Sequence, residues 1–256
     1  MTDADVTWEV TGRVGVLTLQ RPKVNAFATG TWQALDVALA SLAGHDRMSA
    51  VVLRSGLPTI FSAGADVTEL PMTPAVDEAR QALTRRVLAS VVAFPVPIVC
   101  AVPGPALGGG CALAAACDIR LATRSARFGL PEIDVGRCGG ARHLMRHLPQ
   151  SVVRHAAFTG KPISAIDAHR LGFVSELFDT ADELDEAALD LAADIAGKSP
   201  TAVRLAKQSL DLAEELPLLP GYAVEQQFSL RLARTDDAAE AALAFREQRP
   251  PRWTED

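Results

Sequence analysis

Two short apolar runs constrain the fold of this chain most strongly. Residues 50–54 (AVVLR) and 96–102 (VPIVCAV) are apolar at consecutive positions, so both faces of each segment are suited to burial. Strands that are buried on both faces are typical of parallel sheets covered by helices. Between the two runs, apolar residues recur at helical spacing, at Val76, Leu83, Val87 and Val91. The order strand, helix, strand therefore predicts an α/β fold with a parallel sheet.

The N-terminal part of the chain has a hairpin pattern followed by a helical one. Two β-rich runs within residues 6–20 are separated by a Thr-Gly pair, which predicts a hairpin. Apolar residues then recur at helical spacing over 32–42. We expect Thr29 or Thr31 to cap this helix and Gly44 to end it.

The C-terminal part is almost wholly helical in pattern over residues 181–248 and offers no strand to a sheet. The residues that would divide it into three or four helices are Pro200, Pro217 and Pro220-Gly221. We therefore expect a core over 1–195 that binds the ligand. The region 196–256 would make subunit contacts and cover the pocket.

Composition excludes several classes of function. The 256 residues have a formal net charge of −6, so no basic field is available for nucleic acid. The N-terminus lacks the pattern of a secretory signal, and no apolar run is long enough to span a bilayer. We expect a soluble, cytoplasmic protein with no membrane partner. The four cysteines lack the paired spacing of zinc sites and are interpreted as reduced.

Two glycine turns are the main candidates for a functional site. Gly108, Gly109 and Gly110 precede a small-residue helix, and residues 62–66 (SAGAD) form a second turn after a strand. Neither turn has the spacing of a dinucleotide or P-loop motif. Each is an oxyanion hole or simply a tight turn. Two such turns could each donate one N–H to the same enolate oxygen, as chemistry beside a thioester carbonyl requires.

Glu132 is the candidate acid, because it follows Leu130-Pro131 at the entry to a loop. Without further context, an acid at this place is expected to cap the next helix. His143 and His147 are spaced four apart, but flanking arginines oppose a bound cation, so we expect them to be solvated or packed and no metal to be bound.

Together these pieces resemble the crotonase family of enoyl-CoA hydratases and isomerases. The matching segments are RPKVNAF (21–27), FSAGADVTEL (61–70), PIVCAVPGPALGGGCALAAACDIRLAT (97–123), FGLPEIDVG (128–136), FTGKPISAIDAHRLGFVSEL (158–177) and FREQRPP (245–251). They follow the family's order over nearly the whole chain. The resemblance implies the crotonase (ClpP-like) spiral of ββα units with a C-terminal helical trimerisation region. It also implies a homotrimer or a dimer of trimers.

The resemblance further implies a coenzyme A thioester as substrate, no permanently bound cofactor and no metal. It assigns the oxyanion hole to the backbone N–H groups of Ala65 and Gly109. The residues that it assigns to coenzyme A contacts are Lys23, Asn25, Ala26, Ala63 and Asp66, with Lys23 or Arg21 as the candidate for the phosphates.

The sequence departs from the family's hydratases at one catalytic position. Those enzymes have one glutamate directly after GGGC and another in the PE dipeptide; here the first position is Ala112 and the second is Glu132. Hydration uses both carboxylates, whereas a 1,3-proton shift needs only one. We therefore favour a Δ3,Δ2-enoyl-CoA isomerase with Glu132 as base, its pKa raised by apolar neighbours.

Two alternatives stay open. A 2-enoyl-CoA hydratase would need a substitute second group, for which Asp134 and Arg137, or nearby Cys138, are candidates. A non-catalytic acyl-CoA-binding protein would keep both glycine turns, but it would have no use for Glu132.

Overall fold

The structure is a computed structural model that describes residues 5–253. A six-stranded sheet in the order β1-β2-β3-β4-β6-β9 forms its centre, and a three-stranded sheet in the order β5-β7-β8 lies beside it. The strands are β1 (Val6–Thr11), β2 (Val14–Leu19), β3 (Ala50–Ser55), β4 (Ile98–Val102), β5 (Ala106–Leu107), β6 (Ile119–Thr123), β7 (Arg127–Gly129), β8 (Ile163–Ser164) and β9 (Glu176–Phe178).

The predicted parallel sheet and hairpin are both present. β1 and β2 pair antiparallel, and every other pairing in the large sheet is parallel. The five residues of β4 are all buried, because helices cover both faces of this part of the sheet. The alternation of apolar strands and helices thus specifies a covered parallel sheet.

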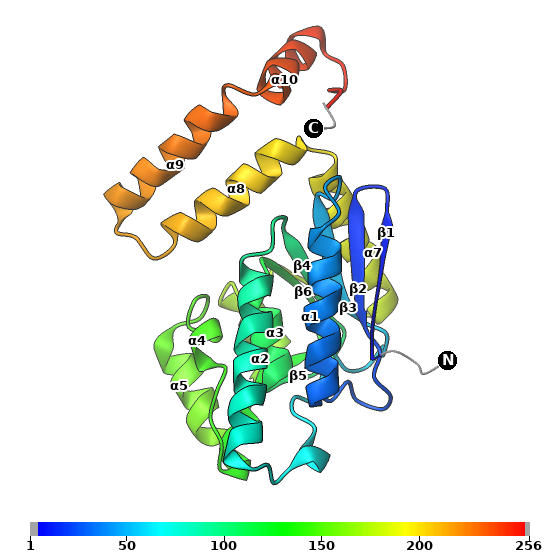
Figure 1. Ribbon diagram of the computed structural model, residues 1–256, viewed down its shortest axis with the longest axis vertical. Helices are drawn as coiled ribbons and strands as arrows, with labels where there is room; N and C mark the ends of the chain where they lie inside the picture. The colour runs from blue at the N-terminus through cyan, green and yellow to red at the C-terminus, as the bar shows by residue number, and fades with distance from the viewer. Residues whose placement is uncertain (1–4, 254–256) are drawn as a thin grey trace.

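Helices form the remaining layers around the sheet (Figure 1). They are α1 (Thr29–Ala43), η1 (Val67–Glu69), α2 (Pro74–Val92), α3 (Gly109–Ala116), η2 (Pro131–Val135), α4 (Ala141–Leu144), α5 (Gln150–Thr159), α6 (Ala165–Arg170), α7 (Ala181–Ala196), α8 (Pro200–Ala213), α9 (Leu218–Leu232) and α10 (Asp236–Glu247). One apolar cluster joins the sheet to α1, α2 and α3. A second joins the opposite face to α7.

The cap of α1 differs from the expected one. Neither Thr29 nor Thr31 is the N-cap, which is Ala28 and has no side-chain cap hydrogen bond. The carboxylate of Glu69 instead accepts hydrogen bonds from the N–H of Thr29, at 3.0 and 3.1 Å. Glu69, which is distant in the sequence, therefore satisfies an N–H group at the start of the helix that a local cap residue would otherwise satisfy. Gly44 ends the helix as predicted.

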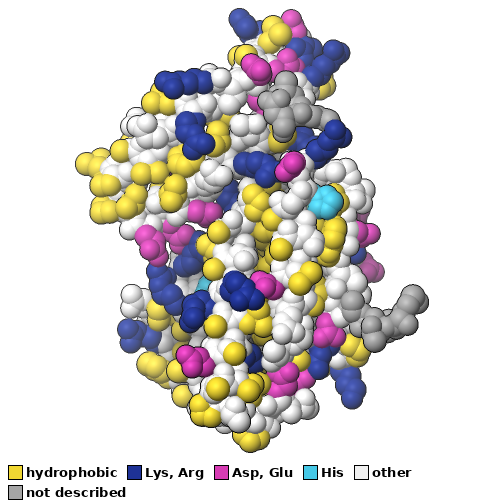
Figure 2. All heavy atoms as spheres, viewed as in Figure 1, with side chains coloured by type: hydrophobic (Ala, Val, Ile, Leu, Met, Phe, Trp, Pro, Cys, Tyr) yellow, Lys and Arg dark blue, Asp and Glu magenta, His cyan; other side chains and the backbone are white. Residues whose placement is uncertain are grey.

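The C-terminal helices α8, α9 and α10 extend away from the sheet, and α8 and α9 run side by side (Figure 1). Pro220 and Gly221 lie inside α9, so the expectation that this pair divides two helices is wrong. Exposed hydrophobic side chains gather over the end of the α8–α9 pair (Figure 2). Among them, Leu218 and Leu219 are 84% and 76% exposed.

Candidate active site

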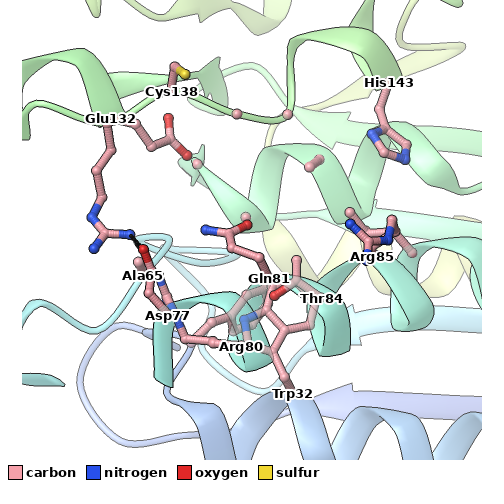
Figure 3. A pocket seen from close by; sticks show the side chains of 18 of the residues that line it. Trp32, Ala65, Asp77, Arg80, Gln81, Thr84, Arg85, Glu132, Cys138 and His143 are labelled. Atoms are coloured by element: carbon pink, nitrogen blue, oxygen red, sulfur yellow. Dashed lines mark hydrogen bonds and ion pairs between the residues drawn. The ribbon is translucent and has the colours of Figure 1, made fainter. Parts of the chain in front are cut away.

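A cavity of about 720 Å³ lies between α2, the glycine turn before α3 and the loop that contains η2. Trp32 and the turn residues Ala65, Gly108 and Gly109 line it, and polar side chains of α2 face it (Figure 3). Glu132 enters the cavity from the loop opposite that helix. The cavity therefore brings together the two glycine turns and the acid that the sequence singled out.

The two glycine turns are in direct contact. Gly64 and Gly108 have φ values of +85° and +53°, which favour glycine. A β-carbon on Gly64 would lie 2.8 Å from the carbonyl oxygen of Leu107, and one on Gly108 would lie 3.6 Å from the α-carbon of Gly64. The backbones can pack this closely only because Gly64 has no side chain, since 3.6 Å is an ordinary van der Waals distance.

The amides of Ala65 and Gly109 follow these glycines. The bonds from Phe27 N–H to the carbonyl of Gly64 and from Asp66 N–H to the carbonyl of Phe27 fix the chain on either side of Ala65. Gly109 is the first residue of α3, and N–H groups in the first turn of a helix have no partner within that helix. Both residues line the cavity. Their backbone geometry is therefore compatible with donation to a bound oxygen.

Glu132 lies in the first turn of the short helix η2, not at its cap. The N-cap is Leu130, and no side chain caps the helix, so the interpretation of Glu132 as a capping acid is wrong. Its Oε1 lies where a β-carbon on Gly108 would come within 2.6 Å, while Oε2 is buried with no hydrogen-bond partner. Burial raises the pKa of Glu132, as expected from its apolar neighbours. A half-buried carboxylate with a free oxygen is suited to accept a proton.

Ala112 is also in the wall of the cavity. Its side chain is 3% exposed and lies 3.4 Å from the position of a β-carbon on Gly140. Apart from Glu132, Asp77 is the one carboxylate among the described residues that line the cavity. Its two oxygens accept hydrogen bonds from Nη1 of Arg137 at 2.9 and 3.0 Å (Figure 3, dashed line). This arginine lowers the pKa of Asp77, which makes that acid a poor proton donor.

The structure separates the two residues that were candidates for an auxiliary role. Arg137 lines the cavity, together with exposed Cys138. Asp134 is not part of the cavity wall; its Oδ2 lies 2.7 Å from the position of a β-carbon on Gly160. Asp134 and Glu132 are two residues apart in a 3₁₀ turn, so their side chains point in different directions. The expectation that Asp134 could supply a second catalytic group is therefore not supported by its position.

Two of the residues expected to contact coenzyme A use their side chains inside the protein. The amide of Asn25 donates to the carbonyl of Leu19, to Oγ of Ser55 and to the carbonyl of Phe61. The carboxylate of Asp66 accepts from the N–H and hydroxyl of Thr68 and from Arg21. These bonds, those from Thr68 first, lower the pKa of Asp66 to about 2. Any ligand contact at these two positions would be made by the backbone.

The other three residues in that group differ in their exposure. Lys23 has φ +74°. Its side chain is exposed, so its ammonium is available to solvent. Ala26 and Ala63 are half-buried, the first accepting a hydrogen bond at its carbonyl from Arg21. Since Arg21 is also paired with Asp66, Lys23 is the better candidate for a phosphate contact. The lining of the cavity includes none of the five expected coenzyme A residues.

Sequence reasoning missed the polar side chains of α2. Asp77, Arg80, Gln81 and Thr84 all line the cavity, and Arg85 lies farther along the same helix. Positions three and four apart share a helix face, so this polar stripe was a usable signal. The apolar residues Leu83, Val87 and Val91 of the same helix, which the sequence did single out, are buried, whereas Val76 is 52% exposed.

Of the two histidines His143 and His147, only the first lines the cavity. His147 makes a 3.0 Å hydrogen bond through Nε2 with the carbonyl of Ala115, and burial is the main cause that lowers its pKa to about 4. Within residues 5–253, no cluster of side chains suited to a metal ion is found, and no helix is long and apolar enough to cross a membrane.

Comparison with known proteins gives a consistent result. The model of the enoyl-CoA hydratase/isomerase family matches residues 9–256. The 2,3-dehydroadipyl-CoA hydratase of Escherichia coli K12 is 37% identical over 246 residues, covering 93% of this chain and 94% of that protein. The mitochondrial methylglutaconyl-CoA hydratase of Mus musculus is 33% identical over 241 residues, covering 90% of this chain and 75% of that protein.

A solved structure agrees with the sequence comparisons. The crystal structure of an enoyl-CoA hydratase from Bacillus anthracis superposes with a TM-score of 0.93 at 28% identity, covering 98% of this chain and all of that one. The expected crotonase fold is confirmed. The substrates of this family are coenzyme A thioesters, and its hydratases need no permanently bound cofactor. The chain belongs to the enoyl-CoA hydratase/isomerase family.

Proposed function

We propose that the protein moves a proton within an enoyl-CoA thioester, with Glu132 as the only base, as a Δ3,Δ2-enoyl-CoA isomerase does. The observation that supports this most directly is the pair of Glu132 and Ala112 in one cavity. One wall position offers a half-buried carboxylate with a free oxygen, and the other offers only a methyl group. Addition of water needs a second group to hold and activate that water, whereas isomerisation does not.

The proposed reaction is balanced by a single carboxylate. Glu132 removes a proton from C2 of a 3-enoyl thioester, and the electrons of the C–H bond pass into a dienolate. The amides of Ala65 and Gly109 donate hydrogen bonds to its oxygen. The protonated Glu132 then returns the proton at C4, the double bond moves to C2–C3, and the carboxylate is regenerated. Loss of one oxyanion donor typically raises such a barrier by about 3 kcal/mol.

Hydration of a 2-enoyl thioester is the second candidate, because both relatives described above are named hydratases. In this chain the second acid would have to be Asp77, the other carboxylate of the cavity. Its bond to Arg137 opposes that role. Under the hydratase alternative, Asp77→Asn abolishes addition of water; under the isomerase proposal, isomerisation continues in this variant.

Assays of 3-enoyl and 2-enoyl thioesters, run side by side on the wild type and Glu132→Gln, test the proposal. We expect isomerisation to exceed hydration in the wild type and to fall at least about 100-fold in the variant. Robust hydration that survives Glu132→Gln would contradict the proposal. Binding of thioesters with neither turnover nor exchange of the C2 proton into deuterated water would indicate a non-catalytic binding protein.

We propose that Lys23 contacts a phosphate of coenzyme A and that backbone groups of residues 25–26 and 63–66 contact the rest of it. The core over 1–195 would hold the ligand, in a cytoplasmic protein.

The region 196–256 would join subunits into a trimer or a dimer of trimers. The exposed leucines at the end of α8 and α9 support subunit contacts, since large exposed apolar patches mark interfaces. Sedimentation analysis of the intact chain tests the assembly.

A further inference from the structure

Arg80 is a buried cation in the cavity wall with no adequate partner. It is 7% exposed, and it lines the cavity from α2. Its Nε is buried without a hydrogen-bond partner. The nearest acid among the described residues is Asp77, whose Oδ1 lies 3.7 Å from Nη2 of Arg80, too far for a hydrogen bond. The guanidinium therefore has unused donors at the wall of a cavity.

Asp77 cannot make up this deficit. Both of its oxygens are bonded to Nη1 of Arg137, at 2.9 and 3.0 Å. The carboxylate of Asp77 thus lies near two guanidinium groups, and it is hydrogen-bonded to that of Arg137 and not to that of Arg80. A buried charge without a partner costs stability, so such a group is typical of a site that is completed by a ligand.

The other charges around the cavity leave a surplus of positive charge. Arg85 adds a third guanidinium, whereas Glu132 is the one further acid among the described lining residues. Burial lowers the pKa of His143, so this histidine does not need a negative partner at neutral pH. The surplus is local, because the chain as a whole has a net charge of −6. An anionic group inside the cavity would therefore be attracted.

We propose that Arg80 binds a carboxylate at the far end of the acyl chain, so that the preferred substrates are coenzyme A monothioesters of dicarboxylic acids. This inference rests on the proposed function, since it takes the cavity to hold the acyl group. Glu132 and Arg80 lie on different walls, the first on the η2 loop and the second on α2 (Figure 3). One end of the acyl group would meet the base and the other the guanidinium. The fork of an arginine matches a carboxylate with two parallel hydrogen bonds.

Equilibrium binding of two unreactive thioesters tests the inference without any catalytic step. The probes are adipyl-CoA, which ends in a carboxylate, and hexanoyl-CoA, which has the same chain length and no charge. Calorimetry on the intact wild type should show adipyl-CoA binding about 10- to 100-fold more tightly, the effect of one charge-assisted hydrogen-bonded pair. Equal affinities would overturn the inference. They would also be the result if a carboxylate of a second subunit paired with Arg80, because Arg80 would then not bind the ligand.

Variants locate the effect. In Arg80→Met the ratio of the two affinities should fall to about one, and in Arg80→Lys it should be intermediate, because a lysine keeps the charge but loses the fork. Arg86→Met is the matched control, since Arg86 lies on the same helix but is exposed and paired with Asp36 outside the cavity. A ratio that changes equally in Arg80→Met and Arg86→Met would overturn the role of Arg80.

The binding ratio tests the role of Arg80 separately from the role of Glu132 as the base. If Glu132 is not the base, turnover assays on Glu132→Gln reveal it while the binding ratio is unaffected. If the cavity does not select a carboxylate, the binding ratio reveals it even when isomerisation proceeds as proposed. Thermal unfolding of each variant checks its fold, and Arg80→Met should not unfold at a lower temperature, because it removes an unpaired buried charge.

Discussion

A carboxylate oxygen of Glu132 lies where Gly108 has no side chain. A β-carbon on Gly108 would come within 2.6 Å of Oε1 of Glu132 and within 3.6 Å of the α-carbon of Gly64. The missing β-carbon of Gly108 therefore lets the acid reach the turn, whereas 3.6 Å to Gly64 is an ordinary van der Waals distance. This single contact couples the proposed oxyanion hole to the proposed base.

Replacement of Gly108 by alanine should reduce activity more than stability. The residue has φ +53°, so an alanine is strained there, and its β-carbon would displace the carboxylate of Glu132. A displacement of about 1 Å can cost about 100-fold in rate, and we expect a loss of that size in kcat/KM. Gly12→Ala is the control, since Gly12 has φ +60° with nothing within 4 Å of its β-carbon. It should lose about 1 kcal/mol of stability and no activity.

The pKa of Glu132 sets an acid limit for activity. Burial raises this pKa, and the base must be ionised to accept a proton, so kcat/KM should fall with decreasing pH from above the ordinary range of glutamate. A pH–rate profile with the 3-enoyl thioester measures this limb. A limb in the ordinary range of an exposed glutamate would contradict the buried position of the base.

The same raised pKa predicts how stability depends on pH. Below the pKa of the unfolded chain, Glu132 is protonated in both states and costs nothing. As the pH rises through the higher pKa of the folded state, the buried charge destabilises the fold. Glu132→Gln should therefore unfold at a higher temperature than the wild type at neutral pH, and the difference should shrink in acid. A variant that is less stable at neutral pH would count against this explanation.

Introduction of a carboxylate at position 112 should create hydration activity. Ala112 lines the cavity, as Glu132 does, so a glutamate there can hold a water molecule beside the substrate. We expect Ala112→Glu to raise hydration of a 2-enoyl thioester by about 10-fold or more, at a cost of about 1–3 kcal/mol for the larger buried side chain. Ala112→Gln has the same size without the acid and should show no gain. Equal gains in both variants would assign the effect to shape alone.

Arg120 stabilises the end of α3 that lies away from the cavity. Its side chain is 5% exposed and donates to the carbonyls of Phe173, at 2.7 Å, and Cys117, at 2.6 Å. Arg120→Met leaves both carbonyls without this partner and should cost about 2–4 kcal/mol in urea unfolding. Arg124→Met removes an exposed arginine paired with Asp179 and should change stability by less than about 1 kcal/mol. Similar losses in the two variants would contradict the structural role of Arg120.

The sequence was sufficient to predict the parallel sheet and the turns. β3 and β4 are apolar on both faces, and the glycines at 64 and 108 mark turns after strands, so both follow from local pattern. The contact between those turns did not follow from either turn alone. It depends on β5 and on the bridge between Ser62 and Ala106, which join segments far apart in the chain.

The parts of the site that the sequence did not predict depend on which segments pack against a residue in the folded protein. Periodicity shows that Arg80 and Leu83 belong to α2, but not which of them faces a cavity wall made by another segment. Asn25 has the residue type of a ligand contact, yet the surrounding carbonyls occupy its amide. Such partners are set by tertiary contacts, and no local pattern records them.

Conversion of a 3-enoyl thioester deuterated at C2 tests the single-base claim most directly. If Glu132 removes the C2 hydron and returns it, part of the deuterium should appear at C4 of the 2-enoyl product of the wild type. Glu132→Gln should form product at least about 100-fold more slowly. A 3-hydroxyacyl thioester as the main product, or unchanged turnover by Glu132→Gln, would contradict the claim.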